Sequence, residues 1–228
     1  MILNLKQLFK KYKIQSKGII HVGAHHGDEL VQYLEHDIKN ILCFEPLKLN
    51  FQKLKEKSKI LNSSKIINFH LENYALGEEK KEVEMFVEEA NKGMSSSILE
   101  PSLHLKQYPH IVFEKKEKVK MLTLDGYFEK NKSDIYDFIN IDVQGYELNV
   151  FKGAIKTLEN IKYIMTEVNR KELYKGCTQI KELDDFLYQH GFKRKITNWA
   201  GKTWGDAFYI KEEDNFMNRF KKSVHDLF

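Results

Sequence analysis

The chain has 228 residues, of which 42% are hydrophobic and 31% are charged, and it contains only 3 prolines. This composition is typical of a globular protein and excludes a mainly disordered or fibrous chain. The net charge of +4 comes from basic and acidic residues that are interspersed, so the sequence does not indicate a nucleic-acid or anionic-membrane role. The length suits one domain, and we expect it to span 1–228, with an N-terminal helix over 1–17, a core over 18–212 and a C-terminal helix over 213–228.

The cysteines and the N-terminal stretch bear on the cellular compartment. Cys43 and Cys177 lie far apart in unlike contexts, so neither a disulfide framework nor a zinc site is indicated. Lysines occur throughout MILNLKQLFKKYKI, which therefore resembles neither a signal peptide nor a membrane span. Its apolar residues recur at helical spacing and predict a helix that packs on the domain. These features favour a cytoplasmic protein without a transmembrane segment.

Strand and helix patterns alternate in the first third of the chain. Residues 18–22 form a short apolar, β-branched run, and NILCFEP and KIINFHL predict two further strands. Pro46 favours a helix start, because proline is tolerated in the first helical turn. We expect a parallel sheet with helices on both faces. The apolar faces of the two connecting helices are predicted to contain Leu30, Val31, Leu34, Leu47, Phe51 and Leu54.

The middle of the chain has a different pattern. In KKEVEMFVEE, apolar residues alternate with acids, and VKMLTLDGYF gives a second extended stretch, so we expect an inserted antiparallel hairpin. Between them, NKGMSSSILEPSLHLKQYPHI is rich in Gly, Ser and Pro and predicts a long loop or lid.

The strand and helix alternation resumes in the last third. DFINIDV, IKYIMTEV, FKRKITNW and GDAFYIKEE predict four strands, with a helix through Val150 and Ile155 and another over 180–190. The whole pattern predicts a Rossmann-like α/β fold with a mostly parallel, seven-stranded sheet. The C-terminal stretch places Met217 and Phe220 on one helical face, which we expect to pack on the domain or on a second copy in a homodimer; a membrane-surface helix is the alternative.

A glycine turn and a later acid indicate a nucleoside cofactor. Gly23 and Gly27 stand where the first strand should pass into a helix, and Glu45 ends the second strand, where a carboxylate can accept hydrogen bonds from ribose hydroxyls. A dinucleotide site prefers a glycine at the position of His25, and the chain lacks a G-x-x-x-x-G-K-[ST] phosphate loop. S-adenosylmethionine, which has a ribose but no phosphate, suits this pattern better than NAD or FAD.

The motifs HVGAHHGDE, FEP, NYALG, SSSIL and FINIDVQGYEL, in this order, resemble those of the FkbM family of S-adenosylmethionine-dependent methyltransferases. The resemblance extends from about Gly18 to Ile210 and implies a class I methyltransferase fold. The first family motif commonly reads D-V-G-A-N-x-G, so His21 replaces an acid and His25 an asparagine. The later motif commonly reads I-D-V-E-G-x-E, and Gln144 stands where its glutamate is expected.

The resemblance also implies roles for individual residues. Gly23, Ala24 and Gly27 would line the methionine end of the cofactor, and Glu45 would hold the ribose. Asn73 and Ala75 fall where adenine is contacted, and Asp142 would face the amino group or the transferred methyl. The implied cofactor-binding set is His21, Gly23, Ala24, Gly27, Glu45, Pro46, Asn73, Ala75, Ser97 and Asp142. The alternative is a purely structural role, in which the glycines serve only helix–strand packing and Asn73 and the serines only shape loops.

Methyl transfer to an alcohol needs alignment and a general base. Asp142 and Glu167 end consecutive predicted strands, whose carboxyl ends converge on such a site, so they are the candidate catalytic residues. Glu147, His26 and His104 rank behind them. We expect no metal site, since the adjacent histidines at 25 and 26 do not share a helical face, although magnesium between Asp142 and Glu167 is left open.

The acceptor is inferred only from the resemblance, which implies O-methyl transfer to a hydroxyl of a sugar, a glycan or a related hydroxylated metabolite. Trp199 and Trp204 are candidates for stacking on a sugar face, and core packing is their alternative role. Two histidines and a tyrosine in SLHLKQYPHI are candidates for lining an acceptor cleft. The alternatives are an RNA methyltransferase, which should have a basic, aromatic groove, and a non-catalytic nucleoside-binding module.

Overall fold

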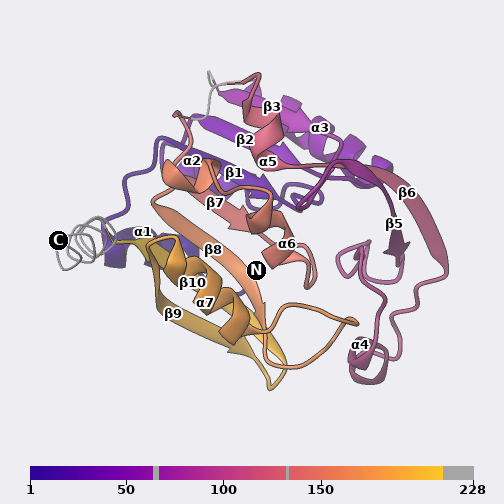
Figure 1. Ribbon diagram of the computed structural model, residues 1–228. Coiled ribbons are helices and arrows are strands. Elements are labelled where there is room, and N and C mark those ends of the chain that lie inside the picture. The colour runs from indigo at the N-terminus through magenta and orange to yellow at the C-terminus, as the bar shows by residue number, and fades with distance from the viewer. Residues whose placement is uncertain (64–66, 132–133, 213–228) are drawn as a thin grey trace.

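The computed structural model describes residues 1–63, 67–131 and 134–212 of the chain. Its centre is a seven-stranded sheet in the order β3-β2-β1-β7-β8-β10-β9 (Figure 1). This confirms the predicted Rossmann-like class. The strands are β1 (Gly18–Val22), β2 (Asn40–Phe44), β3 (Asn68–Glu72), β7 (Phe138–Ile141), β8 (Tyr163–Asn169), β9 (Phe192–Ala200) and β10 (Trp204–Lys211).

The order of the strands creates one reversal point. β1 pairs in parallel with β2 on one side and with β7 on the other, and β8 continues the parallel set. β10 runs antiparallel to both of its neighbours, β8 and β9. The chain therefore builds outward from β1 in both directions, and a crevice opens at the carboxyl ends of β1 and β7, where ligands bind in open α/β sheets.

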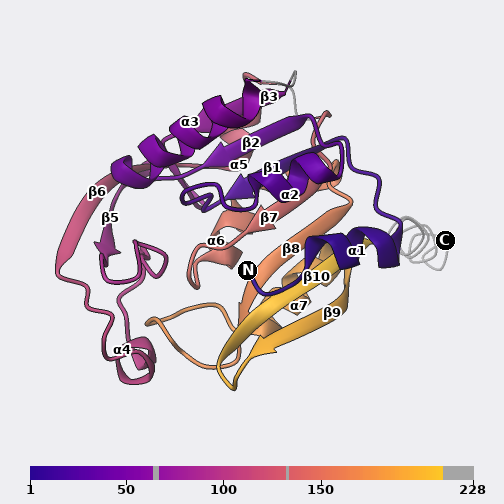
Figure 2. The ribbon, with the colours of Figure 1, turned by 180° about the vertical axis from the view of Figure 1, so that it is seen from behind.

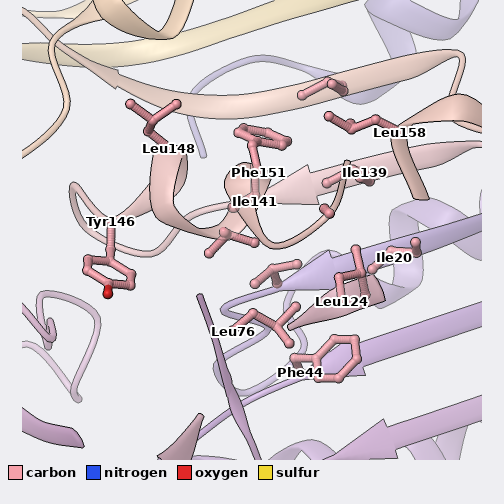
Figure 3. Close-up of a cluster of buried hydrophobic side chains, with 14 of the residues drawn as sticks. Ile20, Phe44, Leu76, Leu124, Ile139, Ile141, Tyr146, Leu148, Phe151 and Leu158 are labelled. Carbon is pink, nitrogen blue, oxygen red and sulfur yellow. The ribbon is translucent and has the colours of Figure 1, made fainter. Parts of the chain in front are cut away.

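Both faces of the sheet are buried at its centre, so the central strands β1, β2 and β7 are mostly apolar, whereas the edge strands β3 and β9 are mostly half-buried or exposed. Ile19 and Ile20 on β1 are each 0% exposed but belong to two different hydrophobic clusters. Helices α1 (Leu5–Tyr12), α2 (Leu30–Glu35) and α3 (Lys48–Asn62) cover one face (Figure 2). Helices α5 (Leu124–Phe128), α6 (Glu147–Lys152) and α7 (Ile180–Gln189) cover the other, and a short 3-10 helix spans Thr157–Glu159. Part of that second core is drawn in Figure 3.

Two predictions about helices need correction. On α2, Leu30 is buried as predicted, but Val31 is 42% exposed, and Tyr33 is the second buried residue. The helix predicted through Val150 and Ile155 ends earlier, since α6 ends at Lys152 and Ile155 is 40% exposed. Both helices are only 6 residues long, so their sequence pattern is too short to fix the buried face or the helix end.

A second, three-stranded sheet has the order β4-β6-β5, with β4 (Ala75–Leu76), β5 (Lys81–Val87) and β6 (Lys115–Leu122). β5 and β6 pair antiparallel, as predicted for the inserted hairpin. The second half of VKMLTLDGYF is not a strand but helix α5. Thr123 caps this helix, because its side-chain oxygen accepts the Gly126 N–H at 3.0 Å.

The predicted loop or lid is a docked segment that contains helix α4 (Leu103–Gln107). Its backbone is attached to the connection after β8: Ser102 N–H donates to the Leu173 carbonyl at 2.8 Å, and Pro101 forms a bridge with Tyr174. The predicted C-terminal helix at 213–228, with its packing or dimer face, lies outside the described residues. In the part of the chain that the structure describes, no helix is long and apolar enough to cross a membrane.

Gly23 is required by the close approach of β1 and β7. Its φ is +79°, and a Cβ at this position would lie 2.0 Å from the carbonyl oxygen of Asp142. We expect Gly23→Ala to lower the free energy of unfolding by about 3 kcal/mol, because left-handed strain adds to an overlap with backbone. Gly201→Ala is the matched control, since φ is +70° there but nothing lies within 4 Å. Equal losses in denaturant unfolding of the two variants would contradict this explanation.

Candidate active site

A cavity, called here the first cavity, lies at the reversal point of the sheet. Residues that follow three neighbouring strands line it: Gly23 after β1, Glu45 after β2 and Asp142 after β7. Their position is a consequence of the parallel pairing, because the carboxyl ends of β1, β2 and β7 meet at one edge.

Glu45 is held rigidly at the edge of this cavity. Its Oε2 accepts the His25 N–H at 2.9 Å, and its Oε1 accepts the Leu47 N–H at 2.9 Å. The Asn73 amide donates to the carbonyl oxygens of Glu45 and Pro46 at 2.9 and 2.8 Å, so it holds the backbone of the turn. Burial raises the pKa of the Glu45 carboxyl to about 7, against the effect of the backbone hydrogen bonds.

The backbone N–H groups of the glycine turn donate to carbonyl groups of the protein. The N–H groups of Gly23 and Ala24 both donate to the Phe44 carbonyl at 3.0 Å, and Gly27 N–H donates to the Ala24 carbonyl at 2.7 Å. A Cβ at Gly27 would lie 2.7 Å from a methyl group of Leu54. The close packing of helix α3 therefore requires a glycine at this position. Of these three residues, only Gly23 lines the first cavity.

A buried relay supports His21, which also lines the first cavity. Asn140 Nδ2 donates to the Tyr33 hydroxyl at 2.6 Å, and this hydroxyl lies 3.1 Å from His21 Nδ1. Because the amide of Asn140 is a donor, the single hydroxyl proton of Tyr33 points to Nδ1, and His21 carries its own proton on Nε2. Burial lowers the pKa of His21, so the imidazole is neutral.

The first cavity is acidic. Among the described residues that line it, four have carboxyl groups and none is a lysine or arginine, and the ammonium group of Met1 is a basic group in the lining. Its other walls are largely apolar. The carboxylates belong to Asp28, Glu29, Glu45 and Asp142, and the apolar side chains include Leu47, Ala75, Leu76, Met85 and Ile98. Such a lining favours a ligand with positive charge and an apolar part, and disfavours phosphates.

A second cavity adjoins the first, and Asp142 and Gln144 line both. Glu167, at the carboxyl-terminal part of β8, lines only the second cavity. The loop that contains α4 supplies His104 and Tyr108 to the opposite lining. The two cavities therefore meet at the residues that follow β7.

Gln144 connects the two candidate bases. Its backbone is left-handed, with φ of +55°, and its side-chain amide donates to Asp142 Oδ1 at 2.7 Å and to Glu167 Oε2 at 3.0 Å. The Tyr174 hydroxyl lies 3.0 Å from Gln144 Oε1 and 2.7 Å from the Ser95 carbonyl oxygen. This network stabilises a costly backbone conformation and fixes both carboxylates at the junction of the cavities.

The acids at this junction differ in their environments. Burial raises the pKa of Glu167 well above its usual value, and the negative charge of Asp142 adds to this. Glu147 lines neither cavity, and its Oε1 accepts the N–H groups of Val143 and Gly145 at 3.1 Å each. Glu147 therefore shapes the turn after β7.

Comparison with known proteins identifies the family of the chain. The family model described as "Methyltransferase FkbM domain" matches residues 21–194. The chain belongs to the FkbM methyltransferase family. The comparison confirms the family and the enzyme class predicted from the sequence, an S-adenosylmethionine-dependent methyltransferase.

Three relatives of this FkbM-family chain show how far the similarity extends. The 2-O-methyltransferase NoeI of Sinorhizobium fredii is 25% identical over 175 residues, which cover 74% of this chain and 70% of NoeI. The crystal structure of an FkbM methyltransferase from Methylobacillus flagellatus superposes with a TM-score of 0.60 and 14% identity. The superposed part covers 89% of this chain and 46% of that protein. Magnesium protoporphyrin IX methyltransferase of Synechocystis, solved with bound S-adenosylmethionine, has a TM-score of 0.50 and 8% identity, with 91% and 76% coverage of the two chains.

The structure separates the predicted site residues of this family member into two groups. Those that line the first cavity are His21, Gly23, Glu45, Pro46, Ala75 and Asp142, and Glu167 lines the second. Those that lie behind the cavities are Ala24, Gly27, Asn73 and Ser97. Ser97 is 0% exposed, and its hydroxyl donates to the Gln144 carbonyl at 2.9 Å, so it supports the turn. His26 lines neither cavity, and its Nε2 lies 3.0 Å from Asn50 Oδ1.

Sequence reasoning missed two residues of this site. Gln144 was identified only as a departure from the family motif, although its amide joins the two acids. Tyr174 lies in the connection after β8 and has no local sequence signal. Within the described ranges, no group of three His, Cys, Asp or Glu residues is arranged to hold a metal ion.

Proposed function

We propose that this FkbM-family protein transfers a methyl group from S-adenosylmethionine to a hydroxyl of a sugar, a glycan or a related hydroxylated metabolite. The observation that carries the proposal is the junction of an acidic cavity with a second, ring-lined cavity at Asp142 and Gln144. The name of NoeI, a 2-O-methyltransferase, supports transfer to oxygen.

The first cavity suits S-adenosylmethionine by its charge. This cofactor carries a sulfonium and an ammonium group but no phosphate, which matches a lining with four carboxylates and no described lysine or arginine. The pyrophosphate of NAD would meet these acids, and it would have to compete with Asp142 and Glu29 for the Met1 ammonium group. At the place of the glycine that a dinucleotide site prefers, the His25 side chain reaches the Lys92 carbonyl, with its Nε2 2.8 Å away.

Individual residues receive roles from their positions. Glu45 would accept the ribose hydroxyls, since each of its oxygens has a further lone pair beside its backbone hydrogen bond. The apolar side chains of Leu47, Ala75 and Leu76 would contact adenine. Asp142 would attract the charged methionine end, and His21 lines the same cavity.

Catalysis in this arrangement combines alignment with proton removal. The bound cofactor would supply an electrophilic methyl group on a positively charged sulfur. The acceptor oxygen forms its new C–O bond as the S–C bond breaks, the bonding pair stays on sulfur, and the hydroxyl proton passes to Glu167. Gln144 orients this carboxylate through its amide at 3.0 Å.

The compartment proposed for this reaction is the cytoplasm. Cys43 and Cys177 are free and buried, which supports a reducing environment.

Cofactor affinity is expected to rise with pH. The pKa of Glu45 is raised to about 7, and hydrogen bonds from ribose hydroxyls favour the ionised carboxylate, so binding below pH 7 requires loss of a proton. The association constant should therefore fall by up to about tenfold per pH unit below 7 and level off above it. Calorimetric titrations between pH 5.5 and 8.5, in roughly one-unit steps, test this. In Glu45→Gln the dependence should vanish; its persistence would assign it to another group.

The proposal itself is tested by calorimetry of the purified protein with S-adenosylmethionine, S-adenosylhomocysteine and NAD. We expect binding in the micromolar range for the first two, on the order of −8 kcal/mol, and none for NAD. Binding of NAD alone would overturn the proposed cofactor. Binding of none of the three would favour a non-catalytic module.

A further inference from the structure

The second cavity has a volume of about 370 Å³ and aromatic walls. Tyr108 from the loop after α4 and Trp204 at the start of β10 both line it. Trp204 Nε1 donates to the Tyr108 hydroxyl at 2.9 Å, which fixes the two side chains relative to each other. Rigid aromatic side chains joined in this way suit a ligand that presents an apolar ring face.

His104 lines the same cavity and has a buried polar atom without a partner among the described residues. It is only 3% exposed, and its Nδ1 has no hydrogen-bond partner among the described residues. Its ring centre lies 5.0 Å from that of Tyr108 and 5.3 Å from that of Tyr174, so aromatic packing holds the imidazole in place. A buried polar atom without a partner costs free energy, and a ligand hydroxyl is the type of group that can pair with a neutral imidazole.

The charge of the second cavity restricts its ligand further. Asp142 and Glu167 supply carboxyl groups. No lysine or arginine occurs among the described lining residues, and the ammonium group of Met1, which also belongs to the lining, interacts with both acids. A phosphate or carboxylate on the ligand would be repelled by these acids, and it would compete with them for the Met1 ammonium group. Hydroxyl groups, in contrast, can donate to these carboxylates.

We propose that the second cavity is the acceptor site and that it selects an uncharged, polyhydroxylated ring, with His104 as a specificity-determining residue. This inference rests on the proposed function, because the acceptor hydroxyl must reach Glu167 at the junction with the first cavity. To the proposed function it adds the location of the acceptor, its lack of charge and a residue that recognises it. Acidic sugars and sugar phosphates are excluded from the cavity.

Trp204 offers a direct readout of binding. The chain has two tryptophans, so Trp199→Phe leaves Trp204 as the only one. This protein, saturated with S-adenosylhomocysteine, is titrated with the methyl glycosides of common hexoses and with their uronic acid and 6-phosphate counterparts. His104→Phe is compared with His70→Phe, a matched control, since His70 is exposed on β3 and lines neither cavity.

Neutral glycosides are expected to change Trp204 fluorescence, and their acidic counterparts to bind at least about tenfold more weakly. His104→Phe should weaken binding of the neutral ligand by about tenfold, whereas His70→Phe should not. Equal binding of acidic and neutral sugars, or unchanged binding by His104→Phe, would overturn the inference. If no neutral glycoside binds while S-adenosylhomocysteine does, the acceptor inference fails alone; if S-adenosylhomocysteine also fails to bind, the proposed function fails with it.

Discussion

Glu167→Gln is expected to lower kcat for methyl transfer by about 10²–10⁴-fold and to leave the affinity for S-adenosylmethionine nearly unchanged. The reason is the position of Glu167, which lines the second cavity but not the first. Glutamine has nearly the same shape, so it removes the proton acceptor and little else. The measurement is transfer of a labelled methyl group to a neutral acceptor from the fluorescence titrations, together with calorimetry of cofactor binding.

The pH profile provides a second signature of this base. Burial, the charge of Asp142 and further nearby acids raise the pKa of Glu167, so its base form becomes populated only as the pH rises. We expect the kcat of the wild type to increase with pH through a pKa above that of an ordinary glutamate. The small residual rate of Glu167→Gln should lack this increase.

Asp142→Asn is the comparison that separates the two candidate acids. Because Asp142 lines both cavities, this variant should weaken cofactor binding as well as slow the reaction. A Glu167→Gln variant with the kcat of the wild type would instead leave Asp142 as the candidate base. Equal effects of both substitutions on cofactor affinity would contradict the separate roles.

The central strands of the sheet were predictable, because a buried strand appears in the sequence as a short apolar run. Ile19 and Ile20 are both completely buried, on opposite faces of the sheet, and such doubly buried strands appear in the sequence as short apolar runs. The acids at 45, 142 and 167 directly follow or end such runs. Their convergence at one edge therefore followed from the strand predictions and the parallel topology.

The contacts within the site were not predictable, because they join residues that are distant in sequence. The Tyr174 hydroxyl reaches Ser95 and Gln144 across loops that have no periodic pattern. Local motifs also do not distinguish residues that line a cavity from those that support its wall. Gly27 packs against Leu54, and Asn73 holds the backbone of Glu45, although both belong to motifs of the implied cofactor site.

Glu45→Ala is expected to weaken S-adenosylmethionine binding by at least about 100-fold at pH 8. Two hydrogen bonds from ribose hydroxyls to an ionised carboxylate contribute about 1.5–3 kcal/mol each, and the substitution removes both. Calorimetry at this pH, well above the Glu45 pKa of about 7, measures the loss with the carboxylate of the wild type ionised. The substitution also leaves the N–H groups of His25 and Leu47 without their acceptor, so thermal unfolding must first show a cooperative transition.

Glu45→Gln and Asn73→Ala separate ligand recognition from support of the turn. The glutamine keeps one oxygen acceptor but no charge, so its affinity should lie between those of the wild type and Glu45→Ala. Asn73 lines neither cavity and only donates to the backbone at 45 and 46, so Asn73→Ala should lower stability with little effect on affinity beyond that. If Glu45→Ala folds and binds S-adenosylmethionine within about tenfold of the wild type, the ribose is not held by this carboxylate. Glu45 would then be, like Asn73, a residue that supports the turn.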